Sequence, residues 1–433
     1  MFIILLKRGG NVAPTRIPPT IEVVRFSFDD TNNMKTHLSI HLRWRAALAP
    51  SLLALFACAA PSLSRADADD ALNFSVQSSA THDNNLFRLS SGNAPARAES
   101  SRSDTIYKFQ GGVHLDKPYA QQRLQADLTA TQYTYQNNRY LNASAVDYRG
   151  AWLWAVTPQL TGVLSADQVS APMSYTDLQS ISNKNLQKNT SRRLTADWAI
   201  DGVWHAVGGV QHLRSATDSG VLTATGNYEQ NSAEGGIKYV SAANNSLTAT
   251  RRQVRGDYLG RSLSYEQSDS ELVGVWQLTG RSRLDAKLGY TDRTHNLAQR
   301  NYAGTTGMLS YQLMPAGKLR FTLATGRDLV PYLEANNSYY VSNFIALTPA
   351  WLVSEKTTIS LRLGFNQNDF RGPLTSVALM REDKVRSAQL SAAWRPASTI
   401  SVDGYLTREQ RSSNISSLDY NDNTIGINGS FRF

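Results

Sequence analysis

Apolar and polar residues alternate strictly along many short segments of this chain. Over 123–130 the sequence reads RLQADLTA, so every second residue is Leu or Ala. Segments 193–200, 283–290 and 359–365 repeat the same alternation. Because side chains of an extended strand point to opposite faces in turn, each segment would present one apolar and one polar face. The pattern therefore predicts β-strands that separate an apolar medium from water.

About eighteen such strands fit between Leu72 and the C-terminus, joined by alternating short and long connections. Most short connections carry the Pro, Gly, Asn or Asp of tight hairpins, and they are expected at 116–118, 157–159, 201–202, 242–245, 279–281, 315–317, 354–356 and 396–398. Longer polar stretches include 90–103, 170–191, 214–226 and 366–382. Short periplasmic turns and long extracellular loops are typical of outer-membrane barrels with an even strand number. Eighteen satisfies this condition, and sixteen is the alternative.

The last ten residues, TIGINGSFRF, form an apolar strand that ends on an aromatic residue. Its apolar face carries Ile425, Ile427, Phe431 and Phe433. Ends of soluble chains usually fray, whereas the last strand of a barrel must close against the first. We therefore predict an all-β fold, a transmembrane antiparallel outer-membrane β-barrel. A soluble sandwich or propeller also alternates, but the terminal Phe433 and the lack of a blade-length repeat argue against it.

The N-terminal part divides into three expected segments. Residues 1–33 are an upstream extension, with translation expected to start at Met34. Residues 34–68 are predicted to form a signal peptide, because Lys35, Arg43 and Arg45 precede an apolar run and Ala66–Ala68 offers a cleavage site. An anchor helix, or acylation at Cys58, is the alternative interpretation. Residues 69–433 would form the barrel in the outer membrane of a Gram-negative bacterium.

Composition narrows the possible functions. Removing the eight Lys/Arg and four Asp/Glu of residues 1–68 lowers the net charge from +9 to +5 and leaves no basic cluster, so no nucleic-acid partner is expected. The only cysteine lies in the predicted signal, which leaves the mature chain without disulfides or cysteine-bound metals. HExxH, GxSxG and phosphate-loop motifs are absent. We predict no catalytic residues, metal or cofactor; an enzyme would have to use His205, His212 or His295.

Charged residues at the inward positions of the strands are candidates for the lumen wall. They are Arg149, Arg193, Arg252, Arg283, Lys287, Arg320, Arg362 and Arg432, together with Asp127, Asp147, Asp197, Asp285 and Asp403. A modest basic excess would favour an acidic glycan or small anions. The alternative, which we prefer, is that these charges fill a wet barrel and pair across strands.

Tryptophans gather close to the expected short turns. These residues are Trp152, Trp154, Trp198, Trp204, Trp276, Trp351 and Trp394. Trp favours the membrane interface because its ring is apolar and its N–H is polar. We interpret this set as the periplasmic aromatic girdle. Tyrosines near the long loops, such as Tyr258, Tyr265 and Tyr302, would join an outer girdle or stack on sugar rings.

Several stretches resemble one known family. They are HDNNLFRL at 82–89, SDTIYKFQGGVHLDKPYAQQRLQADL at 103–128, DYRGAWLWAVTPQLTGVLSADQ at 147–168, RRLTADWAIDGVWHAVGGVQH at 192–212 and LGYTDRTHN at 288–296. They are similar to the outer-membrane protein of exosortase-associated extracellular-polysaccharide operons, usually labelled EpsL. The resemblance implies a barrel that serves polysaccharide biosynthesis and export, with polysaccharide and other export proteins as partners beside outer-membrane lipid. It supplies no functional residues.

The leading hypothesis is therefore a barrel that helps extracellular polysaccharide to cross the outer membrane. The first alternative is a general diffusion porin, and the second is a barrel enzyme that modifies glycan or lipid. A scaffold with a plugged lumen is the third. The barrel follows from the residues, and the polysaccharide follows from the resemblance alone.

Overall fold

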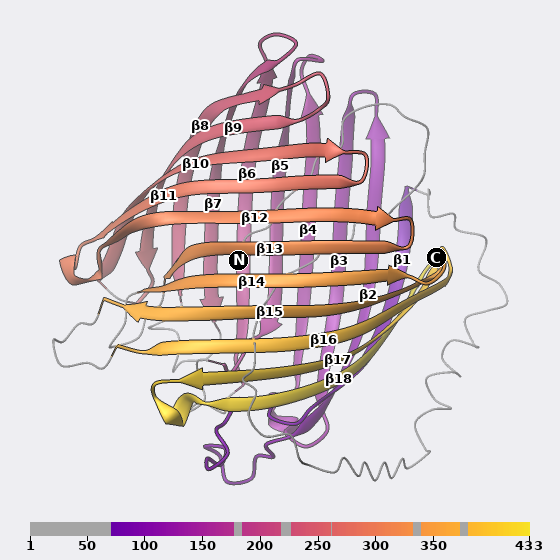
Figure 1. The fold of residues 1–433 in the computed structure, drawn as a ribbon, viewed down its shortest axis with the longest axis vertical. Coiled ribbons are helices and arrows are strands. Elements are labelled where there is room, and N and C mark those ends of the chain that lie inside the picture. Colours follow the sequence, from indigo (N-terminus) through magenta and orange to yellow (C-terminus); the bar gives the residue numbers. More distant parts are fainter. Residues whose placement is uncertain (1–70, 177–183, 218–226, 261, 332–338, 373–379) are drawn as a thin grey trace.

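The computed structural model describes residues 71–176, 184–217, 227–260, 262–331, 339–372 and 380–433. The predicted upstream extension, the signal peptide and the predicted boundary at residues 68–69 all lie outside these residues. Within the described residues, no helix is long and apolar enough to cross a membrane. Nearly all of the described chain forms antiparallel strands of one sheet (Figure 1).

The described part of the chain forms eighteen strands and three single-turn 3₁₀ helices. In order they are β1(Leu72–Asp83), β2(Asp104–Tyr119), β3(Gln122–Tyr135), η1(Arg139–Leu141), β4(Ala143–Ala155), β5(Leu160–Pro172), β6(Leu186–Ala199), β7(Trp204–Thr217), β8(Tyr228–Val240), β9(Ser246–Tyr258), β10(Leu263–Thr279), β11(Ser282–His295), η2(Ala298–Arg300), β12(Tyr302–Ala316), β13(Leu319–Pro331), β14(Tyr339–Leu352), β15(Thr357–Arg371), β16(Glu382–Ala397), β17(Ile400–Ser413), η3(Ser416–Leu418) and β18(Tyr420–Arg432).

Each strand pairs with its sequence neighbours, and the first strand pairs with the last, so the sheet closes on itself. The seam between β1 and β18 runs in continuous register from Ser75↔Arg432 to Asp83↔Thr424. At its end, Phe433 exchanges two backbone hydrogen bonds with Phe74, of 2.6 and 2.9 Å. The fold is thus the predicted closed antiparallel barrel with 18 strands, and the alternative count of 16 is wrong.

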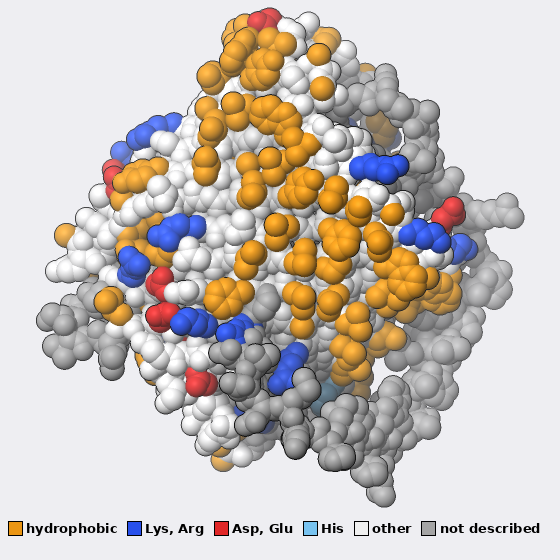
Figure 2. All heavy atoms as spheres, viewed as in Figure 1, with side chains coloured by type: hydrophobic (Ala, Val, Ile, Leu, Met, Phe, Trp, Pro, Cys, Tyr) orange, Lys and Arg blue, Asp and Glu red, His pale blue; other side chains and the backbone are white. Residues whose placement is uncertain are grey.

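The outer surface of the barrel is apolar over a broad band. Figure 2 shows hydrophobic side chains spread across the outer face of the later strands, with most charged side chains gathered beside them toward the long-loop end. Side chains on this outer face are large and exposed to the surroundings: Leu128 is 52% exposed and Leu288 is 66% exposed. A water-soluble sheet would bury such residues. This apolar band therefore matches a lipid environment, and the strand positions that alternate with it point inward.

Most predicted turns lie where the sequence placed them, but the first does not. Pro118 is part of β2 and pairs with Arg123 of β3. The reversal occurs two residues later, at Ala120, whose φ of +49° lies in the left-handed region. Alanine in this conformation is uncommon, so the residue type at position 120 did not indicate a turn.

The predicted girdle tryptophans lie near the short hairpin turns. Trp152, Trp198, Trp276 and Trp394 are between 44% and 53% exposed. Trp204 at the start of β7 packs edge-on against Tyr239 of β8, with ring centroids 5.2 Å apart. Trp154 differs, because its indole Nε1 is buried and the ring covers Gly162 of β5.

Candidate channel lumen

The lumen wall consists of the strand positions that alternate with the exposed apolar ones. Each predicted lumen residue occupies such a position. In β3, Asp127 points to the face opposite the exposed Leu124 and Leu128, and in β15, Arg362 points to the face opposite the exposed Leu361 and Leu363. The strands therefore place these charges on one surface, where cross-strand neighbours are about 5 Å apart. Ion pairs form along this surface.

On the wall from β6 to β11, predicted basic residues pair with acidic residues one or two strands away. Arg193 lies 2.5 Å from Glu234, Arg252 lies 2.8 Å from Asp269, and Lys287 lies 2.6 Å from Glu271. These are distances between nitrogen and carboxylate oxygen. Each pair is at least partly buried, so solvent screens it less than a surface pair. This wall is therefore a charge-balanced surface.

Nearer the short turns of the same wall, Asp197 accepts hydrogen bonds from two groups. His205 of β7 contacts it at 2.6 Å, and Lys238 of β8 forms an ion pair with its second oxygen. Arg283 and Asp285, both on β11, pair with each other at 2.8 Å. Two of the predicted aspartates are thus neutralised within the wall.

A second transverse row crosses β2 to β5. His114 forms a pair with Asp127, Asp127 is in register with Arg149, and Arg149 is in register with Asp167. Arg149 thus lies between two carboxylates on adjacent strands.

These walls also carry carboxylates that offset the basic residues of the predicted set. The acidic partners Glu234, Asp269 and Glu271 also occupy inward positions, but they are not among the predicted lumen residues. Their inward parity on β8 and β10 was the signal that could have identified them. Among the described residues, Arg320, Arg432 and Asp403 form no ion pair.

At the long-loop end, carboxylates of the wall tie the first loops inward. Asp104 is fully buried and accepts hydrogen bonds from the backbone N–H groups of Gln136, Asn137 and Asn138, at 2.8–3.0 Å. Burial alone would lower the pKa of Arg88 in the β1–β2 loop, but the nearby Asp83, Asp422 and Glu409 raise it above its usual value. Arg88 therefore stays charged and anchors this loop against the β1–β18 seam.

The start of the β5–β6 connection crosses the lumen. Tyr175 packs edge-on against Phe87 of the β1–β2 loop, with ring centroids 4.8 Å apart. Arg411 of β17, whose side chain is 1% exposed, donates a 2.7 Å hydrogen bond to the carbonyl oxygen of Thr176. Around the wall, β5 and β17 are separated by five strands. Residues 173–176, which we call the crossing segment, therefore bridge two distant parts of the rim and narrow the lumen.

An aromatic row lines the opposite part of the rim. Tyr228, Tyr258, Tyr265, His295 and Tyr302 come from five consecutive strands, and successive ring centroids are 5.7–6.3 Å apart. Arg293 lies over the Tyr265 ring, 3.9 Å from its centroid. Because Tyr258, Tyr265 and Tyr302 are buried, they stiffen the wall here and do not offer open faces to a sugar.

The three histidines that an enzyme would need lie in separate places. His205 bonds to Asp197 near the short turns, His295 belongs to the aromatic row, and His212 bonds to Asn231 on the outer face. In the described part of the chain, no group of three or more His, Cys, Asp or Glu side chains could hold a metal ion. Within the described residues, these three histidines do not converge on one site.

Comparisons with known proteins support the fold. No protein-family profile and no curated sequence matches the chain. Among solved structures, OpdK, an outer membrane protein of Pseudomonas aeruginosa, superimposes with a TM-score of 0.51 at 10% identity, covering 84% of this chain and 99% of that one. A BenF-like porin from Pseudomonas fluorescens Pf-5 gives the same values. At this identity the similarity establishes a barrel fold shared with outer-membrane porins.

Proposed function

We propose that this protein is a passive channel for small solutes in the outer membrane of a Gram-negative bacterium. The observation that carries the proposal is a closed barrel of 18 strands whose outer face is apolar and whose inner face carries paired charges. Barrels of 16–18 strands enclose an aqueous channel, and their closed sheet leaves no unpaired backbone edge in lipid. The predicted tryptophan girdle and the structural similarity to porins also support a location in the outer membrane.

The crossing segment favours small solutes over polymers. With strands about 4.8 Å apart and tilted by about 40°, eighteen strands enclose a backbone cylinder of about 36 Å diameter. Side chains and the crossing segment reduce the free width below this value. Charges of the wall are mostly paired, so we propose weak ion selectivity and passage by diffusion. No energy source is required for this function.

Polysaccharide export has weaker support. It rests on the sequence resemblance to the exosortase-associated family, whereas the neighbours in structure are porins. The aromatic row, which could have stacked on sugars, is buried. The general diffusion porin is therefore the better-supported alternative, and a catalytic role finds no converging residues among those described.

Liposome swelling tests the proposal. Proteoliposomes are diluted into isosmotic monosaccharide, disaccharide, tetrasaccharide or a long glucan, with protein-free liposomes as the control. The proposal predicts swelling rates that fall steeply with solute size and no entry of the glucan. Equal entry of the glucan, together with loss of secreted polysaccharide in a deletion strain, would instead support export.

A further inference from the structure

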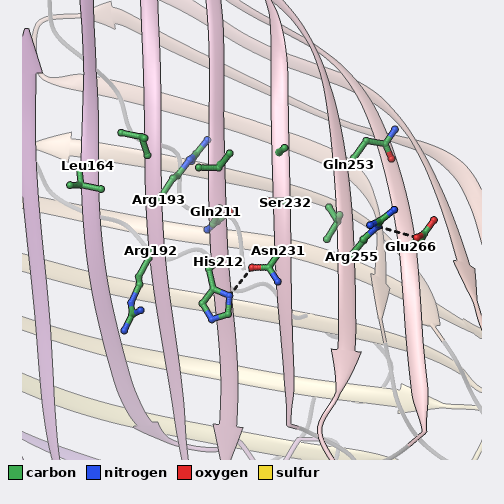
Figure 3. Close-up of a pocket in the computed structure, with 14 residues that line it drawn as sticks. Leu164, Arg192, Arg193, Gln211, His212, Asn231, Ser232, Gln253, Arg255 and Glu266 are labelled. Carbon is green, nitrogen blue, oxygen red and sulfur yellow. Dashed lines mark hydrogen bonds and ion pairs between the residues drawn. The ribbon is translucent and has the colours of Figure 1, made fainter. Parts of the chain in front are cut away.

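A row of polar side chains crosses the outer face of five consecutive strands. Arg192 of β6 is in register with His212 of β7, His212 with Asn231 of β8, Asn231 with Arg255 of β9, and Arg255 with Glu266 of β10. All have the parity of the exposed apolar residues of their strands, so they point away from the lumen. Figure 3 shows these side chains on the outer side of the wall. We call them the polar row.

An apolar row lies directly beside the polar row on its short-turn side. Leu164, Leu194, Val210 and Ala233 are in register across β5 to β8, and the first three are 42–53% exposed. Together the two rows line a groove of about 750 Å³ on the barrel surface. The groove thus places polar groups at the loop-side edge of the apolar band, at the depth where lipid headgroups meet acyl chains.

The charge of the groove is suited to an anion. Arg192 is exposed and forms no ion pair with any residue that the structure describes. Arg255 contacts Glu266 at 3.1 Å, but both side chains remain largely exposed, so this pair is weak. Two outward guanidinium groups of the groove, those of Arg192 and Arg255, therefore accompany one carboxylate, that of Glu266, and the His212 imidazole lies in the same row.

We propose that this groove binds the phosphorylated disaccharide headgroup of lipid A, the membrane anchor of lipopolysaccharide. The inference rests on the outer-membrane location proposed above, because that glycolipid forms the outer leaflet. Guanidinium groups bind phosphate through paired N–H donors. Arg192 and Arg255 are three strands apart, or about 14 Å, which suits one phosphate at each end of a disaccharide. Acyl chains would cover the apolar row.

The next outward row toward the loops would not serve this purpose. In that row Arg214 is in register with Glu229, and Glu229 is in register with Asp257. The two carboxylates would repel a phosphate. The favourable position is thus confined to the polar row and its apolar neighbour. Lipid bound here would hold β6 to β10 at a fixed depth in the membrane.

Binding is tested with the full-length barrel in detergent, using bisphosphorylated lipid A as the probe. Wild type is compared with Arg192→Gln/Arg255→Gln, and Arg327→Gln is the matched control, because Arg327 is an outward arginine of β13 hydrogen-bonded to Asn343. Arg192→Lys/Arg255→Lys keeps the charge but loses the paired donors. Heat-dependent gel mobility verifies folding, and single-channel conductance is recorded on the same samples.

We expect the Gln double variant to raise the Kd for lipid A by about tenfold or more, the Lys variant to fall between, and Arg327→Gln to match wild type. Fully dephosphorylated lipid A should bind as weakly to wild type as lipid A binds to the double variant. Equal affinity in all variants, an equal loss in Arg327→Gln, or millimolar inorganic phosphate binding as well as lipid A would overturn the proposal. Wild-type protein that conducts ions but does not bind lipid A would refute this inference and leave the channel function standing.

Discussion

Replacing Arg411 with Met should loosen the crossing segment and widen the channel. Arg411 donates one 2.7 Å hydrogen bond to the carbonyl of Thr176 and another of 2.7 Å to the carbonyl of Leu418. Met has a comparable length and no donor. Asp383, which lies 3.7 Å from Arg411, keeps its 2.5 Å pair with Arg381. The variant therefore leaves no buried carboxylate without a cation, and the barrel should still fold.

The size of the effect follows from the bond that is lost. A hydrogen bond from a charged donor contributes about 1.5–3 kcal/mol. Among the described contacts, the bond to Thr176 links the crossing segment to β17, so losing it should lower the population of the docked state about 10- to 150-fold relative to detached states. The packing of Tyr175 on Phe87 still opposes detachment. We therefore expect a mixture of docked and detached channels.

Single-channel recording in planar bilayers measures this mixture. Arg411→Met should show frequent transitions to a larger conductance, whereas Arg408→Met, on the outer face of the same strand, should resemble wild type. Identical conductance and noise in a folded Arg411→Met barrel would refute the assignment of the crossing segment as the constriction.

Three further results are expected. Deleting Phe433 removes both terminal backbone bonds to β1 and should lower the yield of heat-modifiable barrel in refolding; an unchanged yield would mean that the seam closes without them. Arg149→Ala removes the cation between two carboxylates. The lost interaction of a cation with this site is about 1 kcal/mol in water, so the cation-to-anion permeability ratio, measured from the reversal potential, should rise about fivefold; a fall in this ratio would contradict the charge row. Fluorescence of the girdle tryptophans should be quenched more by lipids brominated near the headgroup than by lipids brominated near the chain end; the opposite order would exclude a girdle.

Local alternation was sufficient to predict the architecture, because each strand of a membrane barrel repeats the same physical requirement. The apolar face of residues 123–130 and the closing face of Ile425 and Ile427 both lie on the outside of the observed barrel. Strand number followed from the alternation of turns and loops. The first turn was predicted too early in the chain, because Ala120 adopts a left-handed conformation that is uncommon for alanine.

The interior was harder to predict, since it depends on partners far apart in sequence. Glu234 and Asp269 follow the strand parity, yet their roles appear only when the fold brings Glu234 of β8 to Arg193 and Asp269 of β10 to Arg252. The crossing segment depends on the bond between Thr176 and Arg411, which are 235 residues apart. No periodicity within one strand encodes such a contact.

Ionic current through the purified protein tests the central claim most directly. Folded, heat-modifiable barrel is added to a planar bilayer in potassium chloride, and current is recorded at a fixed voltage. A water-filled passive channel predicts discrete upward steps, one for each insertion, with ohmic current at low voltage. Protein that inserts as a folded barrel, verified by protease protection in liposomes, and yet carries no current would contradict the account.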